Sequence, residues 1–247
     1  MLNNKKITVV MPAYNAGATL YETFSNIPSD IVDDVILVDD CSSDYTVEIA
    51  KELKIKTIIH DKNLGYGANQ KTCYNEALKI NSDIIIMLHP DFQYDPRLIP
   101  ALASMIAYDN YDCVIASRFL MQSALKSKMP KYKYIANRFL TFFQNLCLNM
   151  GLSEYHSGYR AFKREILEKI DYNNLNNDFI FDNQILALIL YNGFSVGEIS
   201  CPTKYFDAAS SINFLRSVKY GLGVLIVSLE YILARFKIKV GIFNKLK

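Results

Sequence analysis

Short apolar runs alternate with amphipathic stretches through the first half of the chain. The runs are rich in β-branched residues and end in polar or glycine residues, which predicts strands. The spacing of apolar positions between them predicts helices. The predicted strands are Ile7–Met11, Val35–Val38, Lys56–Ile59, Asp83–Leu88 and Cys113–Ala116, and the predicted helices are Ala18–Asn26, Tyr45–Leu53, Asn69–Ile80 and Pro96–Tyr108. This alternation predicts an α/β fold with a parallel sheet and right-handed crossovers.

Polar side chains follow several predicted strands at the point where each strand ends. They are Asn15, Asp39–Asp40, His89–Asp91 and Ser117–Arg118. In parallel sheets ligands bind beyond the carboxyl ends of the strands, so we expect these residues to gather around one binding site.

Two further helices are predicted in the second half. Phe179–Leu190 has the composition of a buried helix, yet it carries the carboxylate of Asp182. Ile212–Phe236 has an apolar stripe made of Phe214, Leu215, Val218, Leu222, Leu225, Ile226, Leu229, Ile232, Leu233 and Phe236. This stripe packs on the domain core or a second subunit, or it lies in the interface of an anionic membrane. For the basic and apolar residues 237–247 we favour the membrane.

Composition places the chain among folded proteins. It has 247 residues, of which 51% are hydrophobic, enough for one large or two small domains with a buried core. A net charge of +2 gives no argument for a nucleic-acid partner. Five cysteines without a CxxC pair, and only three histidines, argue against a structural zinc site and make a reduced, cytosolic compartment the default.

Positive charge is concentrated in two blocks. Residues 204–247 contain eight Lys or Arg against two acids, a net of +6, and residues 118–138 contain six Lys or Arg and no acid. Such runs are often only solvated faces. Because both blocks lie beside apolar or aromatic residues, they favour an anionic partner.

Membrane-spanning and signal segments are not predicted. Ile7–Met11 is too short for the core of a signal peptide, and no uncharged apolar run reaches the roughly 18 residues that a spanning helix needs. The nearest candidate, residues 220–229, is ten residues long and lies between Lys219 and Glu230. We therefore expect peripheral docking.

Several motifs allow a structural or a functional interpretation. Asp39 and Asp40 either form a turn and cap, or hold a base or ribose. His89, Asp91 and Gln93 face one way if that segment is extended, which gives either a divalent-metal site or a turn; the imidazole suits Mn²⁺ better than Mg²⁺. The block 118–138 either contacts phosphates or forms a soluble loop. The chain has no Walker loop and no GxGxxG after its first strand, and residues 156–160 lack the GxSxG spacing of hydrolases.

Together these segments resemble the family 2 glycosyltransferases, and more closely the branch of dolichyl-phosphate mannose synthases and undecaprenyl-phosphate glycosyltransferases. The likeness covers about residues 7–236. The matching pieces are Val9–Asn15, Val38–Asp44, Asn63–Gly67, Asp91–Pro96, Ala116–Arg118 and Ser157–Arg160. The resemblance implies a GT-A fold, in which a mainly parallel sheet binds a nucleotide sugar and a divalent metal, Mn²⁺ or Mg²⁺.

The resemblance also implies roles for individual residues. The nucleotide-sugar site is formed by Pro12, Tyr14, Asn15, Asp39, Asp40, Gly65, Gly67 and Pro90. The metal is held by Asp91 and Gln93, with His89 beside them. Acceptor or leaving phosphates are bound by Arg118, Lys126, Lys131, Lys133, Ser157 and Arg160. Asp182 matches an acid of the helix that follows, and is the candidate general base for a hydroxyl acceptor.

Three residues depart from the family pattern. His89 stands where the family usually has the first aspartate, Glu154 replaces an aspartate before the Ser-Gly-Tyr-Arg motif, and Gln184 replaces a second acid. His89 removes one anionic ligand, which either shifts metal preference toward Mn²⁺ or marks a retired site. The retention of Asp91, Gln93 and Arg118 argues against retirement.

The expected activity is inverting transfer of a sugar from a nucleoside diphosphate, with UDP favoured over GDP, to a polyprenyl phosphate at the cytoplasmic membrane face. The alternatives are a hydroxyl-directed transferase of surface polysaccharide, a nucleotide-sugar-binding protein without turnover, and a structural partner or homo-oligomer that uses the stripe of 212–236. We expect a catalytic domain over residues 1–205, divided into a nucleotide-sugar half (1–118) and an acceptor half (119–205), and an amphipathic tail over 206–247.

Overall fold

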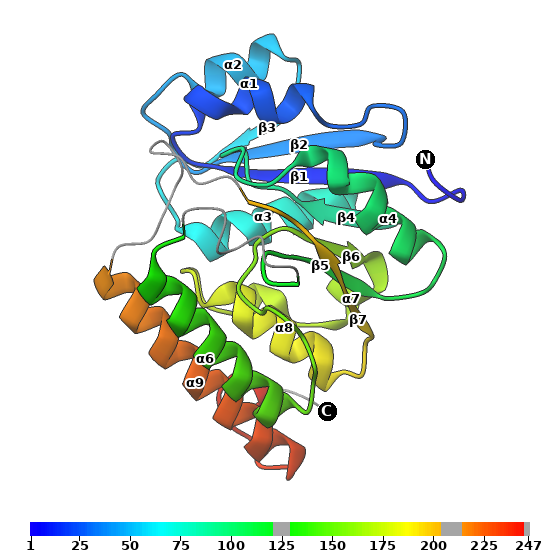
Figure 1. The fold of residues 1–247 in the computed structure, drawn as a ribbon. Helices are drawn as coiled ribbons and strands as arrows, with labels where there is room; N and C mark the ends of the chain where they lie inside the picture. Colours follow the sequence, from blue (N-terminus) through cyan, green and yellow to red (C-terminus); the bar gives the residue numbers. More distant parts are fainter. Residues whose placement is uncertain (121–128, 204–213, 245–247) are drawn as a thin grey trace.

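A mixed sheet flanked by helices on both faces forms the centre of the molecule (Figure 1). The computed structural model describes residues 1–120, 129–203 and 214–244. Within these residues the sheet has seven strands in the order β3-β2-β1-β4-β6-β5-β7. The strands are β1 (Ile7–Ala13), β2 (Asp34–Asp39), β3 (Lys56–Ile59), β4 (Ile84–Met87), β5 (Cys113–Ser117), β6 (Arg160–Lys163) and β7 (Val196–Ser200).

The helices follow the strands in the alternation that the sequence predicts. They are α1 (Gly17–Ser25), α2 (Thr46–Glu52), α3 (Tyr66–Lys79), α4 (Ile99–Ala107), α6 (Lys131–Leu148), α7 (Arg164–Lys169), α8 (Phe181–Tyr191) and α9 (Phe214–Arg235), with short 3₁₀ turns at Pro96–Leu98, Tyr172–Asn174 and Gly241–Phe243. All five predicted strands and all six predicted helices are confirmed, with ends that move by a few residues.

The sheet is parallel except at one strand. β1 pairs in parallel with β2 and β4, β2 with β3, and β5 with β7, whereas β6 is antiparallel to both β4 and β5. The sequence did not predict β6 and β7, which are four and five residues long and include charged residues.

The first strand continues through Pro12, which the sequence pattern predicts as the start of a turn. Pro12 pairs with Val38 of β2 in the register of the ladder. On its other side, β1 pairs with β4 only from Ile7 to Val10. The backbone of Val10 accepts a bond from Leu88 on that side, and Pro12 has the same parity. Its missing N–H therefore costs no ladder bond.

Two apolar cores fill the two faces of the sheet. One packs α3 and α8 against the sheet through side chains that include Tyr74, Phe162 and Phe181. The other packs α1 and α4 through Leu20, Leu102 and their neighbours. The buried helix predicted around Asp182 is confirmed as α8.

Helix α6 begins inside the basic block 118–138, whose structure the sequence left open, and extends ten residues beyond it. It runs beside α9, and the two helices pack together (Figure 1). The inner side of α6 buries Leu140, Thr141, Gln144 and Leu148. Five further apolar side chains face outward, at 50–72% exposure: Tyr132, Ile135, Phe139, Phe142 and Leu146. The helix thus presents apolar side chains on its outer side as well as on its inner side.

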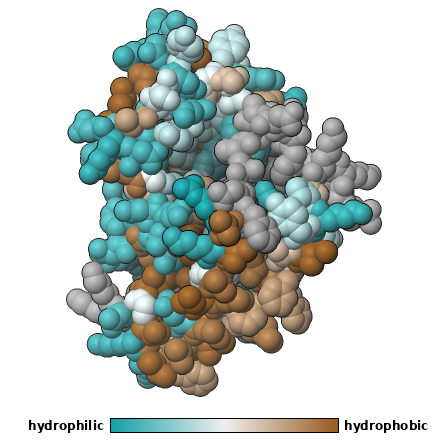
Figure 2. Space-filling view, turned by 90° about the vertical axis from the view of Figure 1, so that its left-hand side faces the viewer, coloured by the Kyte–Doolittle hydropathy of each residue, from teal (hydrophilic) through white to brown (hydrophobic). Residues whose placement is uncertain are grey.

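Helix α9 also carries exposed apolar side chains. In the stripe predicted over 212–236, seven residues are 39–79% exposed (Leu215, Val218, Leu222, Ile226, Leu229, Leu233 and Phe236), whereas Leu225 and Ile232 are partly buried. The helix buries Val224, Val227 and Tyr231. Figure 2 shows apolar residues gathered over the lower half of the face where α6 and α9 lie. Most of the stripe therefore does not pack on the core of its own domain.

The length and composition of α9 change one sequence-based expectation. Leu215–Arg235 spans 21 residues and is apolar enough to cross a membrane, with 28% of its apolar window buried. The sequence test missed it because Arg216, Lys219 and Glu230 interrupt the uncharged run.

Candidate active site

The loops after β1 and β2 are tied together at the carboxyl edge of the sheet. The N–H of Asn15 donates to Oγ of Ser42 (2.8 Å), and Oδ1 of Asn15 accepts from the N–H of Ser43 (2.9 Å). Asn15 has φ 51°, a left-handed conformation that asparagine tolerates. Tyr14 is 56% exposed beside it. Tyr14 and Asn15 thus lie at the predicted nucleotide edge, whereas Pro12 is buried within β1.

The two aspartates after β2 have separate partners. Asp39 accepts hydrogen bonds from the N–H (2.9 Å) and hydroxyl (2.5 Å) of Ser42, which shapes the turn. Asp40 accepts from the N–H groups of Leu64 and Gly65 (2.9 Å each) and binds Nδ1 of His60 (2.8 Å). Both carboxylates are nearly fully buried. The turn interpretation therefore applies to Asp39, and Asp40 anchors the loop that precedes α3.

Gly65 and Gly67 meet a packing requirement at the start of α3. Gly65 has φ 98°, and a Cβ there would lie 2.7 Å from the carbonyl oxygen of Asn177. A Cβ on Gly67 would lie 2.5 Å from the carbonyl oxygen of Asn176, and its N–H donates to Asn177 (2.8 Å). The close approach of the loop at 176–177 thus requires glycine at both positions. This packing explains the two glycines without a contact to the nucleotide.

That approach brings Tyr66 onto Asp182. The hydroxyl of Tyr66 donates to Oδ2 of Asp182 (2.7 Å), and Nε2 of Gln70 donates to Oδ1 (2.9 Å). Burial and the nearby Asp182 carboxylate raise the pKa of Tyr66 well above its usual value, so the phenol stays protonated. Sequence reasoning gave no role to Tyr66 or Gln70, although Tyr66 lies inside the matching piece Asn63–Gly67.

His89 is held on the other side of Tyr66. Its Nε2 lies 3.0 Å from the Tyr66 hydroxyl, and the two rings stack with centroids 5.3 Å apart. The Tyr66 hydroxyl has one proton, which it donates to Asp182. In its contact with His89 the hydroxyl oxygen must therefore accept, and Nε2 of His89 must carry the N–H. A Cβ on Gly158 would lie 2.6 Å from the same nitrogen. In the neutral ring, Nδ1 is then the nitrogen with a lone pair.

The turn after β4 holds the predicted metal ligands. Oδ1 of Asp91 accepts from the N–H of Gln93 (3.1 Å), and Phe92 between them has φ 52°. The carbonyl of Pro90 accepts from the hydroxyl of Thr19 (2.6 Å), which fixes the turn to α1. The segment is therefore a turn, and the extended alternative is wrong.

The donor types at this turn fit a divalent metal that shares its shell with a ligand. In the described part of the chain, no three His, Cys, Asp or Glu side chains form a metal cluster. Asp91 and Gln93 offer a carboxylate and an amide oxygen, and His89 offers one nitrogen. Oxygen donors with one imidazole suit Mn²⁺, and the remaining ligands would be oxygens of a diphosphate.

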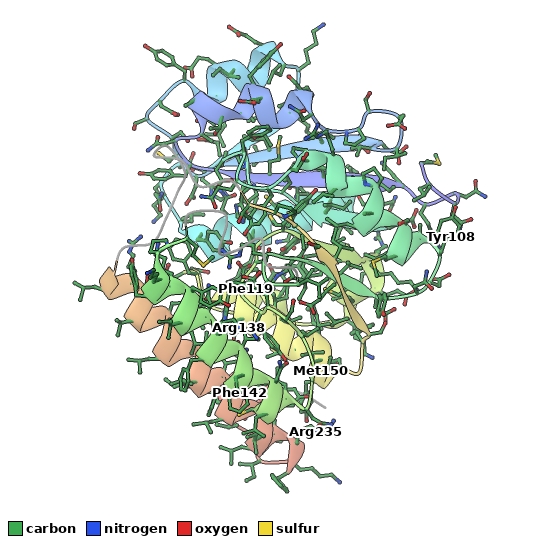
Figure 3. The ribbon with its side chains drawn as sticks, in the orientation of Figure 1. Tyr108, Phe119, Arg138, Phe142, Met150 and Arg235 are labelled. Carbon is green, nitrogen blue, oxygen red and sulfur yellow. The ribbon has the colours of Figure 1, made fainter. Side chains whose placement is uncertain are left out.

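Arg118, predicted to bind phosphate, is paired with the buried carboxylate of Glu154. Its backbone N–H (2.7 Å) and Nε (2.8 Å) both donate to that carboxylate, and Nη2 forms an ion pair with it. Glu154 is fully buried and the Arg118 side chain is 13% exposed. The guanidinium groups of Arg118 and Arg138 lie 5.8 and 5.9 Å from the centroid of the Phe119 ring. Figure 3 shows Phe119 near Arg138. The positive charge of Arg118 is thus largely balanced within the protein.

The Ser-Gly-Tyr-Arg motif packs inside the protein. Arg160 is 1% exposed, and its guanidinium donates to the carbonyls of Ser157 (2.7 Å), Tyr155 (2.8 Å) and Asp182 (2.5 Å). Ser157 is fully buried. These contacts position the start of α8. They also account for the burial of Arg160 without a direct contact between its guanidinium and a phosphate.

One cavity joins the polar cluster to α6 and α9. It has a volume of about 460 Å³. Its polar lining comes from Tyr66, Gln93, Arg118, Lys133, His156 and Asp182. Its apolar lining comes chiefly from Phe139 and Leu140 of α6 and from Val218, Leu222 and Leu225 of α9. Lys131, the first residue of α6, does not line the cavity, although Tyr132 and Lys133 do. Lys126 falls outside the described residues.

Residues 8–171 match the model of the family described as glycosyl transferase family 2. The chain belongs to glycosyl transferase family 2. The family inferred from the sequence motifs is therefore confirmed, and with it the glycosyltransferase class of enzyme. The match covers the sheet from β1 through α7, including every strand end described above.

Family 2 relatives match over most of their length. An uncharacterized protein of Methanocaldococcus jannaschii is 30% identical over 210 residues, which cover 85% of this chain and 86% of the relative. The UDP-N-acetylglucosamine–dolichyl-phosphate N-acetylglucosaminyltransferase of Methanococcus voltae is 25% identical over 93% of this chain and 99% of its own. The second relative agrees with the polyprenyl-phosphate branch inferred from the motifs.

A solved structure of similar fold is glucosyl-3-phosphoglycerate synthase from Mycobacterium tuberculosis, in complex with Mn²⁺, UDP and glucosyl-3-phosphoglycerate. It superposes with a TM-score of 0.64 at 15% identity, over 96% of this chain and 82% of that chain. The same enzyme was also solved with Mg²⁺ and UDP. The similarity confirms the predicted α/β fold of the GT-A type.

Proposed function

We propose that this family 2 glycosyltransferase moves a sugar from a UDP-sugar to the phosphate of a polyprenyl phosphate, at the surface of an anionic membrane. In this reaction an oxygen of the lipid phosphate attacks the anomeric carbon with inversion. The bond from that carbon to the diphosphate breaks, and UDP leaves.

The cavity beside Asp182 is the observation that carries this proposal. A polyprenyl phosphate has an anionic head and a long apolar chain. The cavity offers polar groups at one end, among them Arg118 and Lys133, and apolar walls from α6 and α9. An acceptor that presents a sugar hydroxyl has no apolar chain to pack against the walls formed by Phe139, Leu222 and Leu225.

The donor is assigned to the carboxyl edge of β1, β2 and β4. We assign nucleotide contacts to Tyr14, Asn15 and the neighbouring turn of Asp39, with the sugar diphosphate toward Asp91. Asp91 and Gln93, with His89 beside them, would hold a divalent metal. Such a metal supplies positive charge against the leaving diphosphate. One relative is named for a UDP-sugar, and a solved structure of similar fold contains UDP. Both support UDP as the carrier of the transferred sugar.

A phosphate acceptor also suits the surroundings of Asp182. Both of its oxygens already accept hydrogen bonds, from Tyr66 and Gln70. A lipid phosphate is an anion at neutral pH and needs no general base, so these bonds do not obstruct the reaction. A hydroxyl acceptor would need a base, and Asp182 is the candidate within the cavity.

Docking on the membrane is assigned to the outward faces of α6 and α9. Exposed apolar side chains line both helices, from Tyr132 to Leu146 and from Leu215 to Phe236. Within residues 129–148 and 214–244 there are eight Lys or Arg and one acid, Glu230. Apolar area bordered by cations fits the interface of an anionic leaflet. We assign this leaflet to the cytoplasmic side, where nucleotide sugars are made.

The deciding experiment is transfer from radiolabelled UDP-sugars to polyprenyl phosphate in vesicles that contain anionic lipid. We expect a metal-dependent lipid product and release of UDP, and no product with the matching polyprenol. Asp182→Asn should retain transfer to phosphate. Transfer to polyprenol or glycan hydroxyls, abolished in Asp182→Asn, would instead establish the hydroxyl-directed alternative.

A further inference from the structure

His156 stands at the acceptor end of the cavity without an assigned function. It precedes the Ser-Gly-Tyr-Arg motif and shares the cavity lining with Arg118, Asp182 and Tyr220. The resemblance to the family implied roles for Ser157 and Arg160, but it implied none for His156.

One ring nitrogen of His156 is bound and the other is not. Nδ1 lies 2.9 Å from the hydroxyl of Tyr220 on α9, and the two rings meet edge to face with centroids 5.6 Å apart. Nε2 is buried and has no hydrogen-bond partner among the described residues. Leaving a buried polar nitrogen unpaired is unfavourable, so its presence calls for an explanation.

Counting hydrogen-bond partners gives the tautomer. If Tyr220 donates to Nδ1, the phenolic proton is used and a single donor, the N–H at Nε2, is left unpaired. If Nδ1 donates instead, both the phenolic O–H and the Nε2 lone pair are left unpaired, because Tyr220 has no second partner among the described residues. The first arrangement leaves fewer unsatisfied groups, and it turns Nε2 into a donor.

The ring remains neutral at physiological pH. Burial, reinforced by the positive charges of Arg118 and Arg160, lowers the pKa of His156 to about 3. His156 is therefore a fixed, uncharged hydrogen-bond donor. It does not compete for protons with a phosphate monoester, whose second ionisation lies near pH 6.

We propose that the Nε2–H of His156 donates a hydrogen bond to an oxygen of the acceptor phosphate, and that Tyr220 orients the ring for this contact. The inference rests on the proposed function and adds a binding residue to it. Arg118 is already neutralised by Glu154, so an additional donor beside it has a clear use. His156 lines the same cavity as Arg118, and its bond to Tyr220 places it against α9, whose apolar side chains also line that cavity. A lipid phosphate has its anionic head joined to an apolar chain, which fits this combination.

Two substitutions separate the donor at Nε2 from the bulk of the ring. His156→Gln places an amide N–H near the position of Nε2, whereas His156→Asn places it near Nδ1. With farnesyl phosphate as acceptor, we expect the KM of the acceptor to rise about 10-fold or more in His156→Asn and to be largely restored in His156→Gln. Circular dichroism and Tm establish that both variants are folded.

Tyr220→Phe provides the second test if His156→Asn does not fold. It removes the hydroxyl that fixes the ring and keeps the aromatic contact, so the KM for farnesyl phosphate should rise while kcat changes little. In the wild type, the acceptor KM should show no step between pH 6 and 8 beyond that of the phosphate itself. An imidazolium contact would weaken across that range.

Calorimetry with UDP and Mn²⁺ distinguishes a contact of His156 with the acceptor phosphate from a contact with the diphosphate of the donor. We expect the Kd of UDP to be the same in wild type and His156→Asn. A weakened UDP affinity with an unchanged acceptor KM would assign His156 to the donor diphosphate and overturn the proposal. Unchanged values for both ligands would overturn it as well. If the wild type transfers sugar to no prenyl phosphate, the proposed function fails and this inference fails with it.

Discussion

The hydroxyl of Tyr66 lies 2.7 Å from Oδ2 of Asp182, across a sequence separation of 116 residues. The contact joins the first turn of α3 to the first turn of α8. It depends on Gly65 and Gly67, which let the loop at 176–177 approach, and on Asp40, which anchors the residues before the helix. The nucleotide-side loops and the acceptor-side helix are thereby held in one arrangement.

Replacing Tyr66 with phenylalanine tests this junction. Oδ2 of Asp182 loses its donor, so we expect the free energy of unfolding to fall by about 1–3 kcal/mol. The Tyr66 hydroxyl also contacts His89, which lies beside the proposed metal ligands, and the shift of His89 should lower kcat by about 10-fold or more. Urea denaturation and steady-state kinetics measure the two effects. Tyr45→Phe, at a side chain that is 76% exposed, is the matched control and should behave as wild type.

Asp91→Asn tests the metal site. An amide keeps the shape but removes the only carboxylate among Asp91, Gln93 and His89, so UDP binding in Mn²⁺ should fall to the level measured in EDTA. Isothermal calorimetry gives both values. Asp109→Asn, on an exposed turn, should retain the metal-dependent difference. If Asp91→Asn also retains it, Asp91 does not hold the metal.

Glu154→Gln tests the buried ion pair. The substitution leaves the Arg118 guanidinium without its counter-charge in a largely buried site, and we expect a loss of about 3 kcal/mol in the free energy of unfolding. Glu165→Gln removes an exposed partner of Lys163 and should cost no more than about 0.5 kcal/mol. Equal losses in the two variants would show that the Arg118 charge is balanced in another way.

Charge placed on the outward faces tests the docking surface. Phe142 and Ile226 are 69% and 56% exposed, and neither lines the cavity. The double variant Phe142→Glu/Ile226→Glu should lose binding to anionic vesicles in a flotation assay and keep its Tm. Ile59→Glu, equally exposed on the edge strand β3, is the control and should float like wild type.

Two other results would contradict this assignment. Vesicle binding that survives the double variant would exclude these faces from docking. Wild-type protein that sediments as a concentration-dependent oligomer, and that becomes monomeric in the double variant, would assign the faces to a second subunit. Deletion of the tail is a poorer test, because Val227 and Tyr231 of α9 belong to the core beneath α8.

The buried His156 predicts how stability depends on pH. Its pKa in the folded protein is about 3, below the unfolded value near 6.5, so the unfolded chain takes up the proton first as pH falls. Stability is therefore full above pH 6.5 and declines below it. Between pH 7 and 5 the wild type should lose about 2 kcal/mol more than His156→Gln. Parallel urea titrations at the two pH values measure the difference.

Strands buried on both faces were predictable because a short, continuous run of apolar residues indicates a buried strand. β4, with the sequence Ile-Ile-Ile-Met, is one example. β6 and β7 were not, since Arg160 and Glu198 give them the appearance of loops, and the antiparallel direction of β6 is set by tertiary pairing. In α6 the spacing of Ile135, Phe139 and Phe142 does indicate a helix, but the surrounding lysines favoured a loop.

The sequence predicted where the site residues lie better than it predicted which residues they contact. Asp91, Arg118 and Asp182 do lie around one edge of the sheet. The sequence had no means of pairing Arg118 with Glu154, or Asp40 with the backbone of Gly65, because each contact joins loops from different strands. His156 also escaped notice, since its signal is a nitrogen without a partner, which only three-dimensional structure reveals.

The outward stripes of α6 and α9 have a thermodynamic consequence. Any surface that covers those side chains binds the folded chain and not the unfolded one, so it stabilises the fold by mass action. Under the proposed docking, the Tm of this protein should therefore rise with the concentration of anionic lipid, and stability measured in plain buffer would be its lower limit. Folding and membrane binding would then be coupled equilibria.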